Sequence, residues 1–163
     1  MARLLLVLIQ GCILAVASAA ESPPPEIRAD SDVSTISVDG SWGDGSRVYE
    51  VYPGRFEIKN GQISLRACKS LPYTRIRDDI RNDEMWYGDA SNQKKNYRDI
   101  SIEVENVANC LAGEFRVFRF LITGESPCMA ILMLYASKAD LENNHYAAWG
   151  SVHNQTCYER AKR

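Results

Sequence analysis

The sequence predicts an all-β domain, an antiparallel sandwich or barrel stapled by two disulfides. Three observations support this prediction. From Val33 onward most segments alternate apolar and polar residues, which is the pattern of half-buried strands. Turn residues separate these segments at short intervals, as is typical of sandwiches and barrels. Four of the five cysteines remain once the N-terminal leader is set aside, and an even number favours disulfides.

Residues 1–20 have the features of a secretory signal peptide. Arg3 supplies the positive charge, an apolar run follows, and small residues stand at the cleavage position. Residues 21–32 are polar and contain three consecutive prolines, so we expect a flexible tail. Residues 33–163 are then expected to form a single secreted β domain in an extracellular setting.

The first part of this domain predicts extended segments at 34–40 and 47–54, where residues alternate in character. The clearest element is residues 55–68, in which two alternating runs flank Asn60 and Gly61. An Asn-Gly pair at this position predicts a hairpin, because both central residues of a type I′ turn need positive φ.

Residues 69–99 are charged and only weakly periodic. Ile76 and Ile80 lie four residues apart, which predicts one short helix near 74–86. We expect the rest of this segment to be a long loop. Long loops inside compact domains are uncommon and often functional, so the segment is a candidate binding region.

The second part of the domain predicts four further strands. The run from Met129 to Ala136 is apolar on both faces, so we place it centrally in a sheet. Polar turns are expected between the strands. The predicted strands are residues 100–110, 115–122, 128–137 and 145–157.

The cysteines Cys68, Cys110, Cys128 and Cys157 are expected to form two disulfides. Cys110 and Cys128 flank a strand of about eight residues, whose ends lie roughly 27 Å apart at ~3.3 Å per residue. A disulfide requires Cα atoms within ~7 Å. A meander also brings Cys128 and Cys157 to one end of the sheet. We therefore predict Cys128–Cys157 and, by elimination, Cys68–Cys110.

Charge and motif spacing argue against several classes of partner. The chain has 19 basic and 21 acidic residues and no basic block, so we expect neither nucleic acid binding nor membrane insertion. No two cysteines have the spacing of a zinc knuckle, and no cofactor motif is present.

Asn154-Gln155-Thr156 is a glycosylation sequon, which predicts a glycoprotein if the chain is secreted.

The stretch VDGSWGDGSR, residues 38–47, raises the question of a calcium loop. Asp39 and Asp44 are five residues apart with Trp42 between them, whereas a calcium loop needs more closely spaced oxygen ligands. Asp-Gly pairs are common in turns. We therefore expect two turns with Trp42 packed between them, and no metal.

Aromatic and arginine residues favour a non-enzymatic extracellular binding protein, such as an effector, inhibitor or signalling factor. These residue types dominate binding hot spots in protein complexes. The partner is expected to be a protein or a glycan. The candidate binding residues are Trp86, Tyr87, Tyr97, Arg116, Arg119, Tyr146 and Trp149.

A small secreted hydrolase is a further alternative. Its acid–base residues would be His145 and His153, which are eight residues apart and are the two histidines of the chain. No nucleophile motif such as G-x-S-x-G accompanies them. We therefore predict that the protein is not an enzyme.

A few residues resemble the lipocalin family. Gly40-Ser41-Trp42 is similar to the G-x-W of the first lipocalin strand, and residues 142–146 with Trp149 resemble the T-D-Y-like strand of that family. The two Asp-Gly pairs depart from the family pattern. The resemblance implies a closed β-barrel that carries a small apolar ligand, with Trp42 at its closed end.

Overall fold

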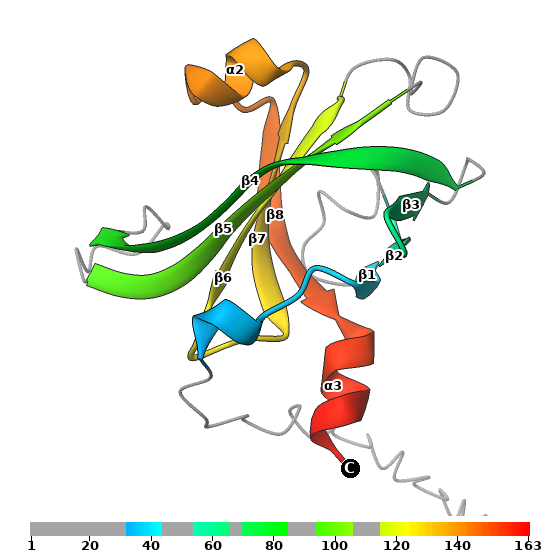
Figure 1. Cartoon of the computed structure of the whole chain (residues 1–163), viewed down its shortest axis with the longest axis vertical. Coiled ribbons are helices and arrows are strands. Elements are labelled where there is room, and N and C mark those ends of the chain that lie inside the picture. Colours follow the sequence, from blue (N-terminus) through cyan, green and yellow to red (C-terminus); the bar gives the residue numbers. More distant parts are fainter. Residues whose placement is uncertain (1–31, 44–53, 66–69, 85–93, 106–114) are drawn as a thin grey trace, which may run out of the picture.

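The computed structural model describes residues 32–43, 54–65, 70–84, 94–105 and 115–163. Eight antiparallel strands form one closed barrel in chain order, and β8 pairs with β1 to close it (Figure 1). The prediction of an antiparallel all-β domain is confirmed, and its architecture is the barrel. The strands are β1 (Gly40–Gly43), β2 (Phe56–Lys59), β3 (Gln62–Leu65), β4 (Leu71–Glu84), β5 (Lys94–Val104), β6 (Val117–Thr123), β7 (Met129–Tyr135) and β8 (Ala148–Asn154).

In the described part of the chain, three short helices accompany the barrel. The 3-10 helix η1 (Val33–Thr35) and α3 (Gln155–Ala161) lie at one end, which we call the base (Figure 1). The helix α2 (Lys138–Glu142) lies at the opposite end, which we call the far end (Figure 1). No helix in the described ranges has the length and apolar character needed to span a bilayer.

The predicted hairpin at Asn60-Gly61 is confirmed. Asn60 has φ 54° and Gly61 has φ 74°, so both central residues occupy the left-handed region that a type I′ turn requires. The flanking apolar residues alternate into the barrel, as the sequence predicts.

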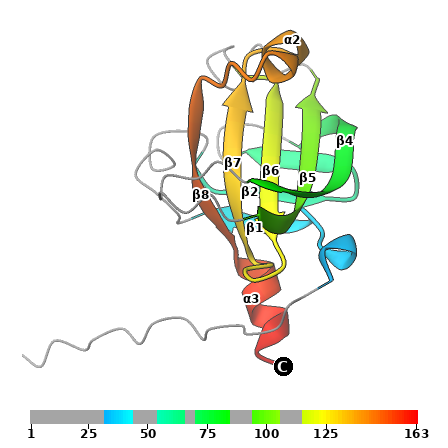
Figure 2. The ribbon, with the colours of Figure 1, turned by 90° about the vertical axis from the view of Figure 1, so that its left-hand side faces the viewer.

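The strands β5 to β8 form the main wall of the barrel (Figure 2). The strand β7 pairs with β6 on one side and β8 on the other, and its residues 130–135 are all buried. The central placement of this apolar run is therefore confirmed.

The predicted helix near 74–86 is wrong, because residues 71–84 form strand β4. The predicted long loop is also wrong across β4 and across residues 94–99 of β5, which pair with each other. A register shift between Arg75 and Arg77 marks a β-bulge. Ile76 packs against an apolar cluster on the outer face of the sheet, which includes Leu121 and Met133. Ile80 lies opposite Arg98 of β5, on the other face of β4. Their four-residue spacing therefore reflects a bulged strand rather than a helical face.

Two boundaries near the C-terminus also differ from the prediction. The expected turn after β7 contains helix α2, whose N-terminus is capped by the Ser137 side chain. The strand predicted over 145–157 is shorter: β8 ends at Asn154, which caps α3. Both cap residues are types that favour helix starts. The segment 34–40 also differs, because it contains η1 and an extended connection before β1.

The predicted disulfide Cys128–Cys157 is confirmed. It joins the β6–β7 turn to α3, with 5.3 Å between the two Cα atoms. Cys68 and Cys110 lie outside the described residues, so their pairing stays a prediction. The predicted strand at 47–54 also falls outside them, apart from Gly54.

Candidate functional site

The inner face of the barrel wall is lined by apolar side chains arranged in rows across the strands. One row contains Ile102, Phe118, Leu134 and Ala148, and the next contains Ile100, Phe120, Leu132 and Gly150. The six large side chains in these rows are fully buried. The described interior is therefore suited to an apolar molecule rather than a charged one.

Side-chain size falls sharply at one end of each row. The rows run from Ile102 and Ile100 on β5 to Ala148 and Gly150 on β8. An eight-stranded barrel is just wide enough to be filled by side chains or to hold one small ligand. The small residues on β8 mark the part of the described wall where side chains occupy least volume.

Trp42 is buried near the base of the barrel, where it lies opposite Asn154 of β8. Its side chain is 1% exposed, and its indole Nε1 donates a 2.6 Å hydrogen bond to the Val38 carbonyl. Its ring lies 5.4 Å from that of Phe120, centroid to centroid. The Trp42 side chain therefore belongs to the apolar core of the barrel near its base.

Arg98 holds the segment around η1 against the base. Its guanidinium donates to the carbonyls of Ser34 and Ile36 and forms two hydrogen bonds with the Asp78 carboxylate. Arg75 donates to the same carboxylate at 2.7 Å. Hydrogen bonds from Arg98 and then Arg75 lower the pKa of Asp78 below its ordinary value. We call Arg98, Asp78 and the two carbonyls the base latch.

Asn154, the residue of the sequon, is a buried part of the base. It is 2% exposed, donates to the Asp39 carbonyl at 3.1 Å and accepts from the Cys157 amide at 3.0 Å. Thr156 of the same sequon accepts a hydrogen bond from the Ser41 amide. A Cβ at Gly40 would clash with the Asn154 Oδ1, so the amide is packed tightly against β1.

The structure brings four of the predicted binding residues to the outer face of the main wall. Arg119 and Trp149 flank Met133 in one row across β6, β7 and β8. Tyr97 and Tyr146 belong to the apolar cluster on the same face. Trp149 is 37% exposed, whereas Tyr97 is buried.

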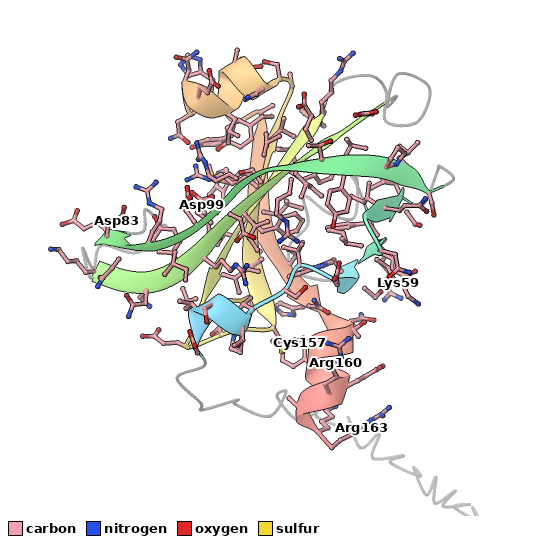
Figure 3. All side chains as sticks on the ribbon, viewed as in Figure 1. Lys59, Asp83, Asp99, Cys157, Arg160 and Arg163 are labelled. Carbon is pink, nitrogen blue, oxygen red and sulfur yellow. A yellow bond between two sulfur atoms is a disulfide. The ribbon has the colours of Figure 1, made fainter. Side chains whose placement is uncertain are left out.

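An ion-pair network covers the centre of this outer face. Asp99 is fully buried, and Arg119 donates to both of its carboxylate oxygens at 2.7 and 2.8 Å. Arg77 and Arg81 lie within 3.5 and 3.9 Å of the same group. Burial opposes the charge of Arg119, but Asp99 outweighs it and raises the pKa of Arg119. Figure 3 shows Asp99 within the curve of β4 and β5.

Tyr97 belongs to the same network. Its hydroxyl donates to the Asp83 carboxylate at 2.5 Å. Burial and this hydrogen bond raise the pKa of Tyr97 to about 12. Tyr97 is therefore a structural hydrogen-bond donor at neutral pH rather than an exposed contact residue.

Arg116 and the two histidines do not join either region. Arg116 is exposed just before β6. Trp86 and Tyr87 lie outside the described residues. His145 is exposed before β8, and His153 lies near the other end of that strand beside Tyr158. The strand separates the two histidines, so they do not share one cleft.

Sequence reasoning missed Arg98, Asp78 and the small residues of β8. Asp78 belongs to a segment with the composition of a solvated, charged surface, and nothing local distinguishes it from its acidic neighbours. Ala148 and Gly150 do carry a signal, since two small residues in alternate positions of a strand leave one face without bulk.

Comparison of the chain with models of protein families, with curated proteins and with solved structures finds no match in any of the three.

Proposed function

We propose that this is a secreted, non-enzymatic binding protein that carries one small apolar ligand inside its barrel. The observation behind the proposal is a closed eight-stranded barrel whose described inner wall is apolar and whose base contains the buried Trp42. The lipocalin-like G-x-W residues belong to that base. The proposal places the ligand against Ala148 and Gly150, with access from the far end.

Secretion and a second disulfide are part of this proposal. The signal-like residues 1–20 and the Cys128–Cys157 disulfide support an oxidising setting. Cys68 and Cys110 would then form the second disulfide.

The first test is native mass spectrometry of protein secreted from eukaryotic cells. A discrete added mass that is lost on denaturation is the expected result. In parallel, the neutral fluorophore N-phenyl-1-naphthylamine should bind saturably to ligand-free protein. The substitution Ala148→Phe fills the interior and should weaken this binding at least about 10-fold, which is the effect of losing ~1.4 kcal/mol.

Ala147→Phe is the matched control, because Ala147 is exposed immediately before β8. It should leave fluorophore binding unchanged. The proposal fails if no ligand mass is found and the fluorophore does not bind. It also fails if both variants bind it like the parent protein.

Docking of an extracellular protein or glycan on the outer face is the second candidate function. The row Arg119–Met133–Trp149 and the partial exposure of Trp149 favour it, since Trp and Arg are common in hot spots. Labelled protein would be screened against an array of glycans and receptor ectodomains. Trp149→Ala should lower any specific signal, and an unchanged signal would contradict this docking surface.

A further inference from the structure

Among the residues that the structure describes, one edge of strand β4 has no pairing partner along most of its length. The strand pairs with β3 only at Leu71 and Pro72, and an added hydrogen bond joins Tyr73 to Gly61. On its other side β4 pairs with β5 as far as Glu84. Across the described ranges, residues 74–84 make backbone ladder hydrogen bonds to β5 alone. Figure 1 shows the ends of β4 and β5 projecting from the barrel.

An exposed apolar side chain lies at the middle of this edge. Ile80 is 60% exposed, the highest value among the large hydrophobic residues that the structure describes. Its neighbours on the strand, Asp79 and Arg81, are also exposed. A free strand edge with an apolar centre is a surface on which another strand can pair.

The charges around Ile80 are self-complementary. Residues 77, 79, 81 and 83 lie on the outer face and read Arg, Asp, Arg, Asp. If two β4 strands pair antiparallel about Ile80, Arg77 faces Asp83 and Asp79 faces Arg81 of the second copy. A two-fold axis repeats both contacts. Opposite charges directly across a strand pair stabilise it, and like charges destabilise it.

The same charges select this register over its neighbours. Antiparallel pairing about Asp79 would place Asp79 opposite itself and Arg77 opposite Arg81. Pairing about Arg81 would place Arg81 opposite itself and Asp79 opposite Asp83. Of these three registers, only pairing about Ile80 avoids the like-charge contacts, and it brings the two exposed Ile80 side chains together.

We propose that a second copy of this chain pairs with the free edge of β4, so that the protein forms a two-fold symmetric dimer through residues 77–83. Self-pairing about one axis is the isologous arrangement that most homodimers use. The interface is narrow, and interfaces below about 1,200 Å² are typically weak. We expect a dissociation constant on the order of 10 µM.

The test is sedimentation velocity of the full secreted chain, from low-micromolar concentration to about 0.5 mM. The parent protein should shift from monomer to dimer. Ile80→Lys should remain monomeric, because it places two ammonium groups together on the axis. D79R and R81D should each remain monomeric alone, since each creates like-charge contacts. An equimolar mixture of D79R and R81D should dimerise, because positions 79 and 81 are both basic in one variant and both acidic in the other.

Glu57→Arg is the matched control, because it reverses an exposed acidic side chain on another strand. It should dimerise like the parent protein, and circular dichroism should show that every variant is folded. A parent protein that stays monomeric throughout the range overturns the proposal and leaves the edge open to an extended segment of another protein. Dimerisation that survives I80K and both single charge reversals overturns it as well, because the contact then lies elsewhere.

Discussion

At the residue scale, the base of the barrel depends on a few polar side chains that bond to backbone. Asn154 joins β8 to β1 through the Asp39 carbonyl and begins α3 through the Cys157 amide. Arg98 joins β5 to the segment around η1. Each of these residues therefore ties segments of the base together through hydrogen bonds to backbone groups.

The sequon predicts a glycan on Asn154, whereas the burial of the Asn154 side chain argues against one. The Asn154 Nδ2 already donates to the Asp39 carbonyl and is packed closely against Gly40, so a glycan on Nδ2 has no room there. We therefore expect Asn154 to be unmodified in the native protein. Intact mass of protein secreted from eukaryotic cells decides this, because a hexose-containing adduct lost on Asn154→Gln would show that the site is used.

Loss of the Asp78 carboxylate should destabilise the base latch. We expect Asp78→Asn to lower the free energy of unfolding at pH 7 by about 1–2 kcal/mol, toward the lower end of the values for hydrogen bonds to charged groups, because the Asp78 side chain is partly exposed. Because the folded pKa of Asp78 lies below its ordinary 3.8, this contribution is present above about pH 4. It is lost as the pH falls through the lowered pKa.

Urea unfolding of parent protein and D78N from pH 7 to pH 2 measures this difference. The two stabilities should converge in acid. Asp79→Asn is the control, since the Asp79 side chain is 61% exposed and should contribute less. A difference between parent and D78N that is constant across this range would contradict the base latch.

At the element scale, the last helix is fixed to the barrel by a covalent bond. The Cys128–Cys157 disulfide closes a loop with a sequence separation of 29 residues. Chain-entropy reasoning for a loop of that size gives a contribution of about 3.5 kcal/mol. We expect the double variant C128A/C157A to lose stability of this order in chemical unfolding.

This variant also tests the second disulfide. If Cys68 and Cys110 are bonded, reducing agent should lower the melting temperature of C128A/C157A further. An insensitive melting temperature would show that no second stabilising disulfide is present. Peptide mapping without reduction would identify the bond directly.

The element that departs most from its sequence pattern is β4. Its stability as a strand comes from pairing with β5 and from ion pairs such as Arg98–Asp78, which join residues 20 positions apart. No window of neighbouring residues contains that information. The bulge between Arg75 and Arg77 resets the alternation, so Ile76 and Ile80 lie on opposite faces of the strand despite their four-residue spacing.

At the scale of the whole molecule, the strands of the main wall pair over more residues than the strands at two seams of the barrel. The strands β5 to β8 pair over five to seven residues at each contact. Among the described residues, the seams β3–β4 and β1–β8 each contain two paired positions. A seam with few hydrogen bonds opens at lower free energy than the wall beside it.

Hydrogen exchange should show this asymmetry. Amides of 129–135 should exchange only with global unfolding, whereas amides of the short strands β2 and β3 should exchange several-fold faster. Mass spectrometry of exchanged peptides measures both regions in one experiment. Equal protection in both regions would contradict a weak seam.

The sequence by itself determined the features that depend on near neighbours. Asn60-Gly61 specified the hairpin turn, because the φ preferences of two adjacent residues are enough to choose it. The continuous apolar run 129–135 specified a strand buried on both faces. The pairing of Cys128 with Cys157 follows from the meander order of strands, which brings them to the same end.

Tertiary structure alone decided the features that depend on distant residues. Closure of the sheet into a barrel depends on the pairing of β1 with β8, which places Trp42 opposite Asn154. The sequence does not show this closure, because the strands of a sandwich have the same alternating pattern as the strands of a barrel. The base latch, the burial of the sequon and the outer row through Arg119 and Trp149 likewise join segments far apart in the chain. Local patterns specify backbone preference and which face is apolar, whereas closure, ion pairing and burial are set by the partner that each face meets in three dimensions.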